Sequence, residues 1–183
     1  MRCRLIFTLM AALFVVPAIV RTQTGRLTLK ATVSETVTLS VAPTFSQSNV
    51  DVLSSGGNTV RITLSGDDPV IRVPLLVRSN SSFKISAESQ TAALSQLMVT
   101  DVHATGSLVS PHVVNAIDKR RKMDLNVTGP FVIASGPRVS LGGTLDSPNN
   151  ALQITVLIRL NSQPSHGSPV QLTFVATAGS PIQ

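Results

Sequence analysis

The stretch from Leu27 to Val41 alternates between apolar and polar side chains. Its odd positions are Leu27, Leu29, Ala31, Val33, Glu35, Val37, Leu39 and Val41, and its even positions hold only Thr, Ser and Lys. A period of two is typical of a β-strand with one buried and one solvent-facing side. Such a strand would extend about 50 Å, whereas most strands have about 5–6 residues. One small domain cannot readily use the whole run, so part of it is expected to serve another purpose.

Residues 1–18 have the features of a signal peptide. Arg2 and Arg4 precede the apolar stretch LIFTLMAALFVV, which is short for a membrane crossing, and small residues precede a cleavage after Ala18. An uncleaved anchor or a buried N-terminal strand is the alternative. We expect a chain exported to the periplasm and then to the cell surface, or secreted, with no stable transmembrane anchor after leader removal.

Export bears on how the mature chain is stabilised. Cys3, the single cysteine among the 183 residues, lies in the predicted leader, so the mature chain has no disulfide. A chain of this length is expected to form one domain once the leader is removed. Its stability must therefore come from the burial of apolar surface, or from a partner.

Composition argues against several partners. Without Arg2 and Arg4, 13 of the 15 basic residues remain against 9 acidic ones, a net charge of about +4 instead of +6. The run Lys119–Lys122 is interpreted as a solvated loop. The chain has no Trp or Tyr, and outside the leader its aromatic residues are Phe45, Phe83, Phe131 and Phe174. Sugar-binding modules and nucleic-acid platforms depend on exposed aromatic faces, so we expect neither ligand.

Short alternating segments recur along the rest of the chain. Their apolar positions are Val60, Ile62 and Leu64; Ile71, Val73, Leu75 and Val77; Phe83, Ile85 and Ala87; Leu152, Ile154, Val156, Ile158 and Leu160; and Val170, Leu172, Phe174, Ala176 and Ala178. Turns are predicted at SGGN, GDDP and GTLDSPNN. The last two segments are expected to form an antiparallel pair, covered on both sides near Leu157 and Val175.

Other segments are less regular. Pro74 removes a ladder donor and predicts an edge strand or a bulge, while Arg72 and Arg78 fall on the solvent-facing side of that segment. Residues 91–98 fit either a short helical turn or an extended chain. MDLNVTGPFVIAS and PRVSLGG predict two further strands. The overall prediction for residues 35–183 is an all-β fold, an immunoglobulin-like antiparallel β-sandwich of about 7–9 strands.

No catalytic, cofactor or metal site is predicted, and we expect no enzymatic activity. Asp101 and His103 would project to the same face of a strand, which is the minimum geometry for a carboxylate-oriented imidazole. No third ligand at a metal-like spacing accompanies them. His112 and His166 are interpreted as exposed loop residues.

Two further sequence patterns are not counted as sites. Asp67–Asp68 is interpreted as a turn before Pro69, because it lacks the spaced acidic loop of a calcium site. Asn80-Ser81-Ser82 and Asn126-Val127-Thr128 match the glycosylation pattern, which a chain of this size matches by accident.

Three interpretations account for the surplus strand. In the first, the chain crosses between the sheets at Ser34–Glu35, and Leu27–Val33 and Val37–Val41 serve the two halves of a self-contained sandwich. In the second, residues 19–34 are an N-terminal extension. Its residues Leu27, Leu29, Ala31 and Val33 then fill an apolar groove of a neighbouring subunit, and repeated head-to-tail exchange gives a fibre. In the third, the exported sandwich is a monomeric binding module that contacts a ligand with its loops.

RLTLKATVSETVTLSV, the later VRITLSG and the closing PVQLTFVATA together resemble the layout of bacterial chaperone–usher pilins, particularly alternate-class fimbrial major subunits and spore coat U-type domains. Those proteins begin with an alternating donor segment joined directly to the first strand. The resemblance implies a fimbrial, adhesive subunit without enzymatic activity. Its implied partners are neighbouring identical or related subunits, a periplasmic chaperone and an outer-membrane usher. The cysteine pair of the U-type domains and the C-terminal tyrosine of many pilins are missing here.

Overall fold

The computed structural model describes residues 34–65, 70–89, 94–106, 109–119, 129–139, 150–160 and 169–179. Several predicted features lie outside these residues. They are the signal peptide, the extension 19–33 with Leu27, Leu29, Ala31 and Val33, the turns at 66–69 and 143–149, the Asn126 pattern, His166 and most of the run Lys119–Lys122.

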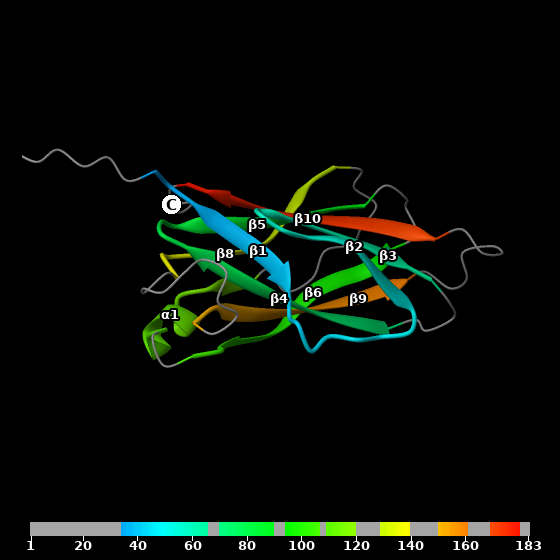
Figure 1. Ribbon diagram of the computed structural model, residues 1–183, viewed down its shortest axis with the longest axis horizontal. Coiled ribbons are helices and arrows are strands. Elements are labelled where there is room, and N and C mark those ends of the chain that lie inside the picture. Colours follow the sequence, from blue (N-terminus) through cyan, green and yellow to red (C-terminus); the bar gives the residue numbers. More distant parts are fainter. Residues whose placement is uncertain are drawn as a thin grey trace, which may run out of the picture. The chain divides into compact units, whose positions relative to one another are not determined.

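The described chain is an all-β sandwich of two antiparallel sheets, as the sequence predicts. Sheet A has the order β1-β4-β9-β6, with β1 (Val37–Val41), β4 (Val70–Ser79), β9 (Leu152–Leu160) and β6 (Leu94–Ala104). Sheet B has the order β2-β3-β10-β5-β8-β7, with β2 (Val50–Gly56), β3 (Thr59–Leu64), β10 (Val170–Ala178), β5 (Phe83–Ser89), β8 (Phe131–Gly136) and β7 (Asp118–Lys119). Figure 1 shows β9 in one layer and β10 in the other.

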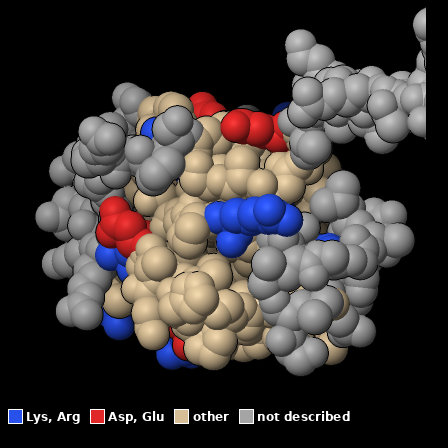
Figure 2. All heavy atoms as spheres, turned by 90° about the vertical axis from the view of Figure 1, so that its left-hand side faces the viewer, with Lys and Arg blue, Asp and Glu red and all other residues tan. Residues whose placement is uncertain are grey.

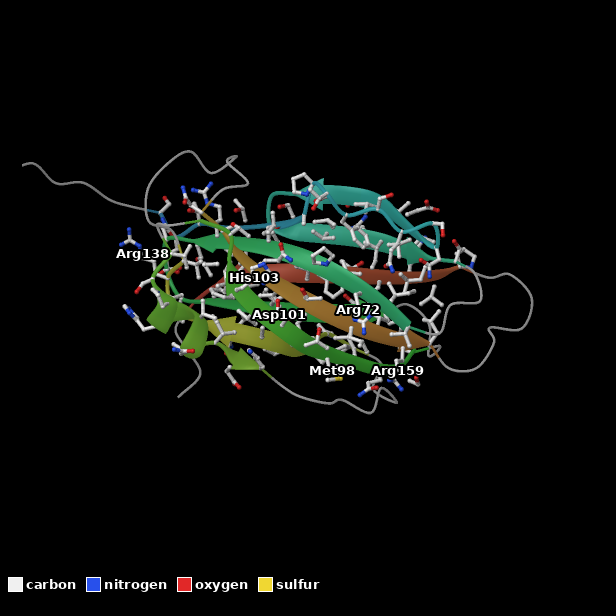
Figure 3. The ribbon with its side chains drawn as sticks, turned by 90° about the horizontal axis from the view of Figure 1, so that it is seen from below. Arg72, Met98, Asp101, His103, Arg138 and Arg159 are labelled. Carbon is white, nitrogen blue, oxygen red and sulfur yellow. The ribbon has the colours of Figure 1, made fainter. Side chains whose placement is uncertain are left out.

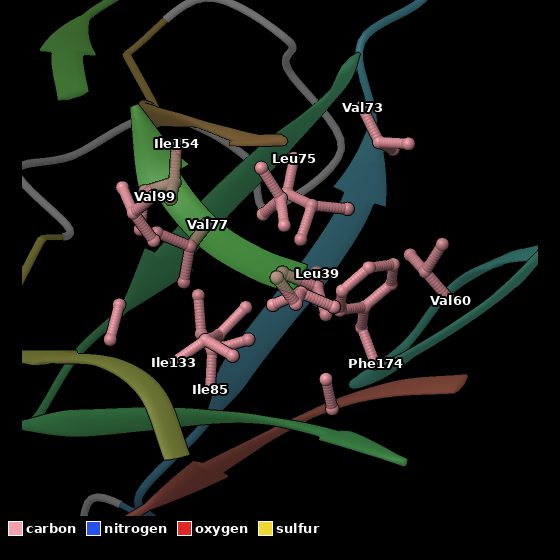
Figure 4. Close-up of a cluster of buried hydrophobic side chains, with 14 of the residues drawn as sticks. Leu39, Val60, Val73, Leu75, Val77, Ile85, Val99, Ile133, Ile154 and Phe174 are labelled. Carbon is pink, nitrogen blue, oxygen red and sulfur yellow. The ribbon is translucent and has the colours of Figure 1, made fainter. Parts of the chain in front are cut away.

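The core lies between the two sheets and is built from the alternating positions that the sequence singles out. The predicted inward residues of β3, β4, β5 and β9 are all buried, and so are those of β10 except Ala178. Figure 4 shows Phe174 packed beside Leu39 and Val60, with Ile85 and Leu75 nearby. Because the core contains no disulfide, this packing is the main stabilising contribution.

β1 closes one seam of the sandwich. It pairs with β4 of sheet A, and its opposite edge reaches sheet B, where Leu39 N–H donates to Gly57 O at 2.8 Å and Val41 N–H to Ser55 Oγ at 2.9 Å. The predicted SGGN turn makes this possible, because Gly57 has φ +60°, a value that the tight β2–β3 turn requires. In Figure 1 β1 lies obliquely across the seam between the layers.

The chain between β6 and β8 packs along part of the opposite seam. It contains α1 (Pro111–Asn115), and Val109, Val113 and Ile117 from this segment are buried in the core. Ile117 packs so closely on Gly136 of β8 that a Cβ at Gly136 would clash with Ile117 Cδ1. The helix was not predicted, and His112 therefore lies in a helical turn instead of the expected loop.

The predicted pairing of the last two segments is wrong. β9 pairs with β4 and β6 in sheet A, whereas β10 pairs with β3 and β5 in sheet B. Two consecutive strands direct alternate residues toward the core whether they pair in one sheet or lie in opposite sheets. The alternating pattern therefore cannot distinguish these two arrangements. Leu157 is covered on its outer side, at 7% exposure, as expected, and Val175 is half-buried.

Pro74 does not mark an edge strand, because β4 lies between β1 and β9. The proline is accommodated where β1 ends. Ala42 N–H donates to Pro74 O at 2.9 Å. A residue with an N–H at position 74 would donate in return to Ala42 O, and Ala42 lies just after the end of β1, so the ladder within β1 loses no bond. Arg78, predicted on the solvent-facing side, is only 3% exposed.

β6 resolves the ambiguity over residues 94–98, which are in a strand, whereas residues 91–93 lie outside the described residues. Its buried residues are Leu94, Leu97, Val99 and Val102, an uneven spacing that resembles a helical one. The register shifts after Leu94 and after Val99, so each bulge inserts an extra residue and breaks the period of two.

Two other segments differ from the prediction. β2 was not predicted, because only Val50 of its seven residues is buried. Of the two expected strands in the middle of the chain, β8 begins only at Phe131, and residues 137–139 of PRVSLGG are not in a strand.

We expect Phe174→Ala to lower the free energy of unfolding by about 3–5 kcal/mol, because it empties a fully buried site in the core. Leu53→Ala is the control, since Leu53 is 56% exposed and should change the free energy by less than about 1 kcal/mol. Reversible urea denaturation measures both. Equal effects of the two changes would contradict the assignment of this core.

Candidate interaction surfaces

The N-terminal entry to the sandwich is held by the side chain of Asn80, in the β4–β5 turn. Asn80 Oδ1 accepts from Thr36 N–H at 2.7 Å, and Asn80 Nδ2 donates to Ser34 O at 2.7 Å. Thr36 O in turn accepts from Asn80 N–H at 3.1 Å and from Ser79 Oγ at 3.1 Å. The amide thus replaces a strand residue and prolongs the β1–β4 pairing beyond Val37.

This arrangement, the Asn80 clamp, fixes the direction of the chain at Ser34. The predicted donor residues Leu27, Leu29, Ala31 and Val33 lie immediately before it and outside the described residues. Glu35, which lies at the sheet crossing in the first of the three interpretations, is exposed and precedes β1. The clamp was not predicted, although Asn80 belongs to the N-S-S pattern, because its partners are distant in sequence.

The strand edges determine where another strand could pair. β10, the last strand, is paired on both sides, by β3 and β5. The outer strands are β1 and β6 in sheet A, and β2 and β7 in sheet B. The edge of β1 is occupied by its bonds to Gly57 and Ser55, whereas β6 is the longest outer strand, with eleven residues.

Asp101 and His103 do lie together, as their spacing predicts. His103 Nδ1 is 2.7 Å from Asp101 Oδ2, and the two side chains are 49% and 57% exposed. They lie on β6 on the face of sheet A turned away from the core, with Met98, Arg72 and Arg159 farther along this face (Figure 3). No group of three potential metal ligands occurs among the described residues. The geometry is that of a hydrogen-bonded pair on the surface, and exposed pairs of this kind contribute about 1 kcal/mol or less.

The face of sheet B that is turned away from the core carries a hollow of about 520 Å³. We call it the sheet B hollow. Its lining comes from β2, β3, β10 and β5 and includes Leu53, Arg61, Glu88, Gln171, Thr173 and Val175. Leu53 and Val52 are the two large apolar side chains of the described residues that are exposed. The sequence did not reveal this hollow, because its residues come from four segments whose outward positions look like ordinary solvent-facing ones.

Among the described residues of the face seen in Figure 2, Lys, Arg, Asp and Glu side chains are scattered over neutral surface, and one red group lies beside blue ones. The described part of the chain contains no helix long and apolar enough to span a membrane. No family model matches the chain, and neither a curated protein nor a solved structure matches it. Inferences about function therefore rest on the surfaces described above.

We expect Asn80→Ala to speed hydrogen exchange of the Thr36 amide about fivefold or more, because the bond from Thr36 N–H to Asn80 Oδ1 is worth about 1 kcal/mol. Asn80→Asp should keep that acceptor but lose the bond to Ser34 O, and should have a smaller effect on Thr36. Ser81→Ala is the control, since Ser81 Oγ donates only to its neighbour Ser82. Unchanged exchange in Asn80→Ala would contradict the clamp.

Proposed function

We propose that the chain is an exported structural subunit of a fimbria-like surface fibre and that it assembles by donating Leu27–Val33 to a neighbouring subunit. One observation carries the proposal. β1 is an outer strand that begins at Val37, and the Asn80 clamp fixes the backbone from Ser34 onward. The alternating segment Leu27–Val33 is therefore joined to the first strand of the sandwich without an intervening loop, which is the layout of a donor segment. The compact unit that contains the sandwich also begins at Ser34.

The physical basis is strand addition. Leu27–Val33 would extend about 23 Å, enough to form main-chain hydrogen bonds along one strand edge while its alternate side chains enter pockets. Because β10 is paired on both sides, the acceptor must be an outer edge, and β6 offers the longest one. A head-to-tail contact of this kind need not close and so gives a fibre. A periplasmic chaperone and an outer-membrane usher would hold and deliver the subunit, which on this proposal is of immunoglobulin-like type.

A second candidate is a self-contained secreted or periplasmic binding module that does not polymerise. The packing at the seams favours it, because β1 bridges to the β2–β3 turn and Val109, Val113 and Ile117 are buried in the core between β6 and β8. In this case Leu27–Val33 docks on its own domain, and the sheet B hollow is the place for a ligand.

We expect Leu29→Asp to abolish assembly of the exported chain, because it puts a charge on the apolar side of the donor segment, where a pocket would have to bury it. Thr32→Asp makes a similar change on the polar side and should leave assembly intact. Sedimentation velocity at matched protein concentrations measures both.

Deletion of residues 19–34 separates the two candidates. Strand donation predicts a folded monomer that no longer assembles. If instead the full chain sediments as a monomer and the truncated chain unfolds at a much lower temperature, strand donation is excluded and the self-contained module is supported.

A further inference from the structure

The outer face of sheet B carries a row of three side chains, in which a neutral residue lies between a positive and a negative one. Thr173 of β10 is in register with Arg61 of β3 on one side and with Glu88 of β5 on the other. Neighbouring strands are about 4.8 Å apart, so the guanidinium and the carboxylate start from positions equally distant from Thr173. Both Arg61 and Glu88 are exposed, and neither forms an ion pair within the described chain.

We propose that a second copy of this chain binds to the outer face of sheet B as a two-fold symmetric dimer. A two-fold axis parallel to β10 and passing over Thr173 places Arg61 of each copy opposite Glu88 of the other. An axis perpendicular to the strands would instead place Arg61 opposite Arg61. The row is therefore self-complementary in one orientation only, which is the requirement for an isologous contact.

The surroundings of the row fit this occupant. Arg61 and Glu88 both line the sheet B hollow, so the long side chains of one copy can enter the hollow of the other. The remaining lining is neutral and includes Thr59, Gln171 and Val175, which add no charge that would repel a second copy. The same axis carries β2, with exposed Leu53, toward the start of β8, where exposed Pro130 offers an apolar contact.

The size of the face sets the strength of the contact. Four strands span about 19 Å and six residues along a strand about 20 Å, a footprint of roughly 400 Å². Stable dimers bury about 800 Å² per partner. We therefore expect a weak dimer that forms at high protein concentration. It does not depend on donation of Leu27–Val33, and in a fibre it would join subunits laterally.

The test is charge reversal followed by mixing. Arg61→Glu gives a row with two carboxylates and Glu88→Arg a row with two guanidinium groups, so each variant alone should dimerise at least tenfold more weakly than the unchanged chain. An equimolar mixture of the two should associate again, because every opposed pair is then of opposite sign. Arg72→Glu is the control, since it makes the same charge change at an exposed position of β4 on sheet A.

Sedimentation equilibrium measures the dimer, in the unchanged chain and in the Leu29→Asp background, where strand donation is blocked. Loss of association in the single variants with recovery in the mixture supports the proposal, even if the Leu29→Asp result excludes strand donation. A monomer at all concentrations overturns it. Association that is unaffected by the single variants, or not recovered on mixing, also overturns it.

Discussion

Leu39 joins the two sheets, and the rest of the sandwich depends on that connection. Its side chain is fully buried between them, its strand pairs with β4 of sheet A, and its N–H donates to Gly57 O at 2.8 Å at the end of the β2–β3 hairpin of sheet B. Because the chain has a single cysteine, Cys3, no disulfide within it can cross-link the two layers. Apolar burial supplies most of the stabilisation, and the directional bonds of β1 determine which strand edges remain available.

These edges limit what the protein can do. With β10 paired on both sides and the β1 edge bonded to sheet B, the edges left among the described strands are those of β2, β6 and β7. In the proposed fibre, a donated strand would extend a sheet that is already formed. The outer face of sheet B offers a different kind of contact, through side chains, because Arg61, Thr173 and Glu88 form one row across three strands. The two proposed contacts would use separate surfaces, so one would not exclude the other.

Sequence patterns predicted the fold class and most of the core, and their failures have physical causes. Val60, Ile62 and Leu64 were assigned correctly because a regular strand shows its buried side every second residue. β6 was ambiguous because two bulges disturb that period, and β2 was missed because it buries almost nothing. Pro74 was misread as an edge because the sequence does not show that β1 stops one residue short of it.

By itself the sequence determined an all-β sandwich with alternating strands, because the period of two is a local property of the backbone. Only the tertiary structure decided that β9 and β10 lie in different sheets, that Asn80 clamps the chain entry, and that Arg61 and Glu88 flank Thr173. The reason is that these relations join residues far apart in the chain. A strand presents the same alternation to the core whichever neighbour it pairs with.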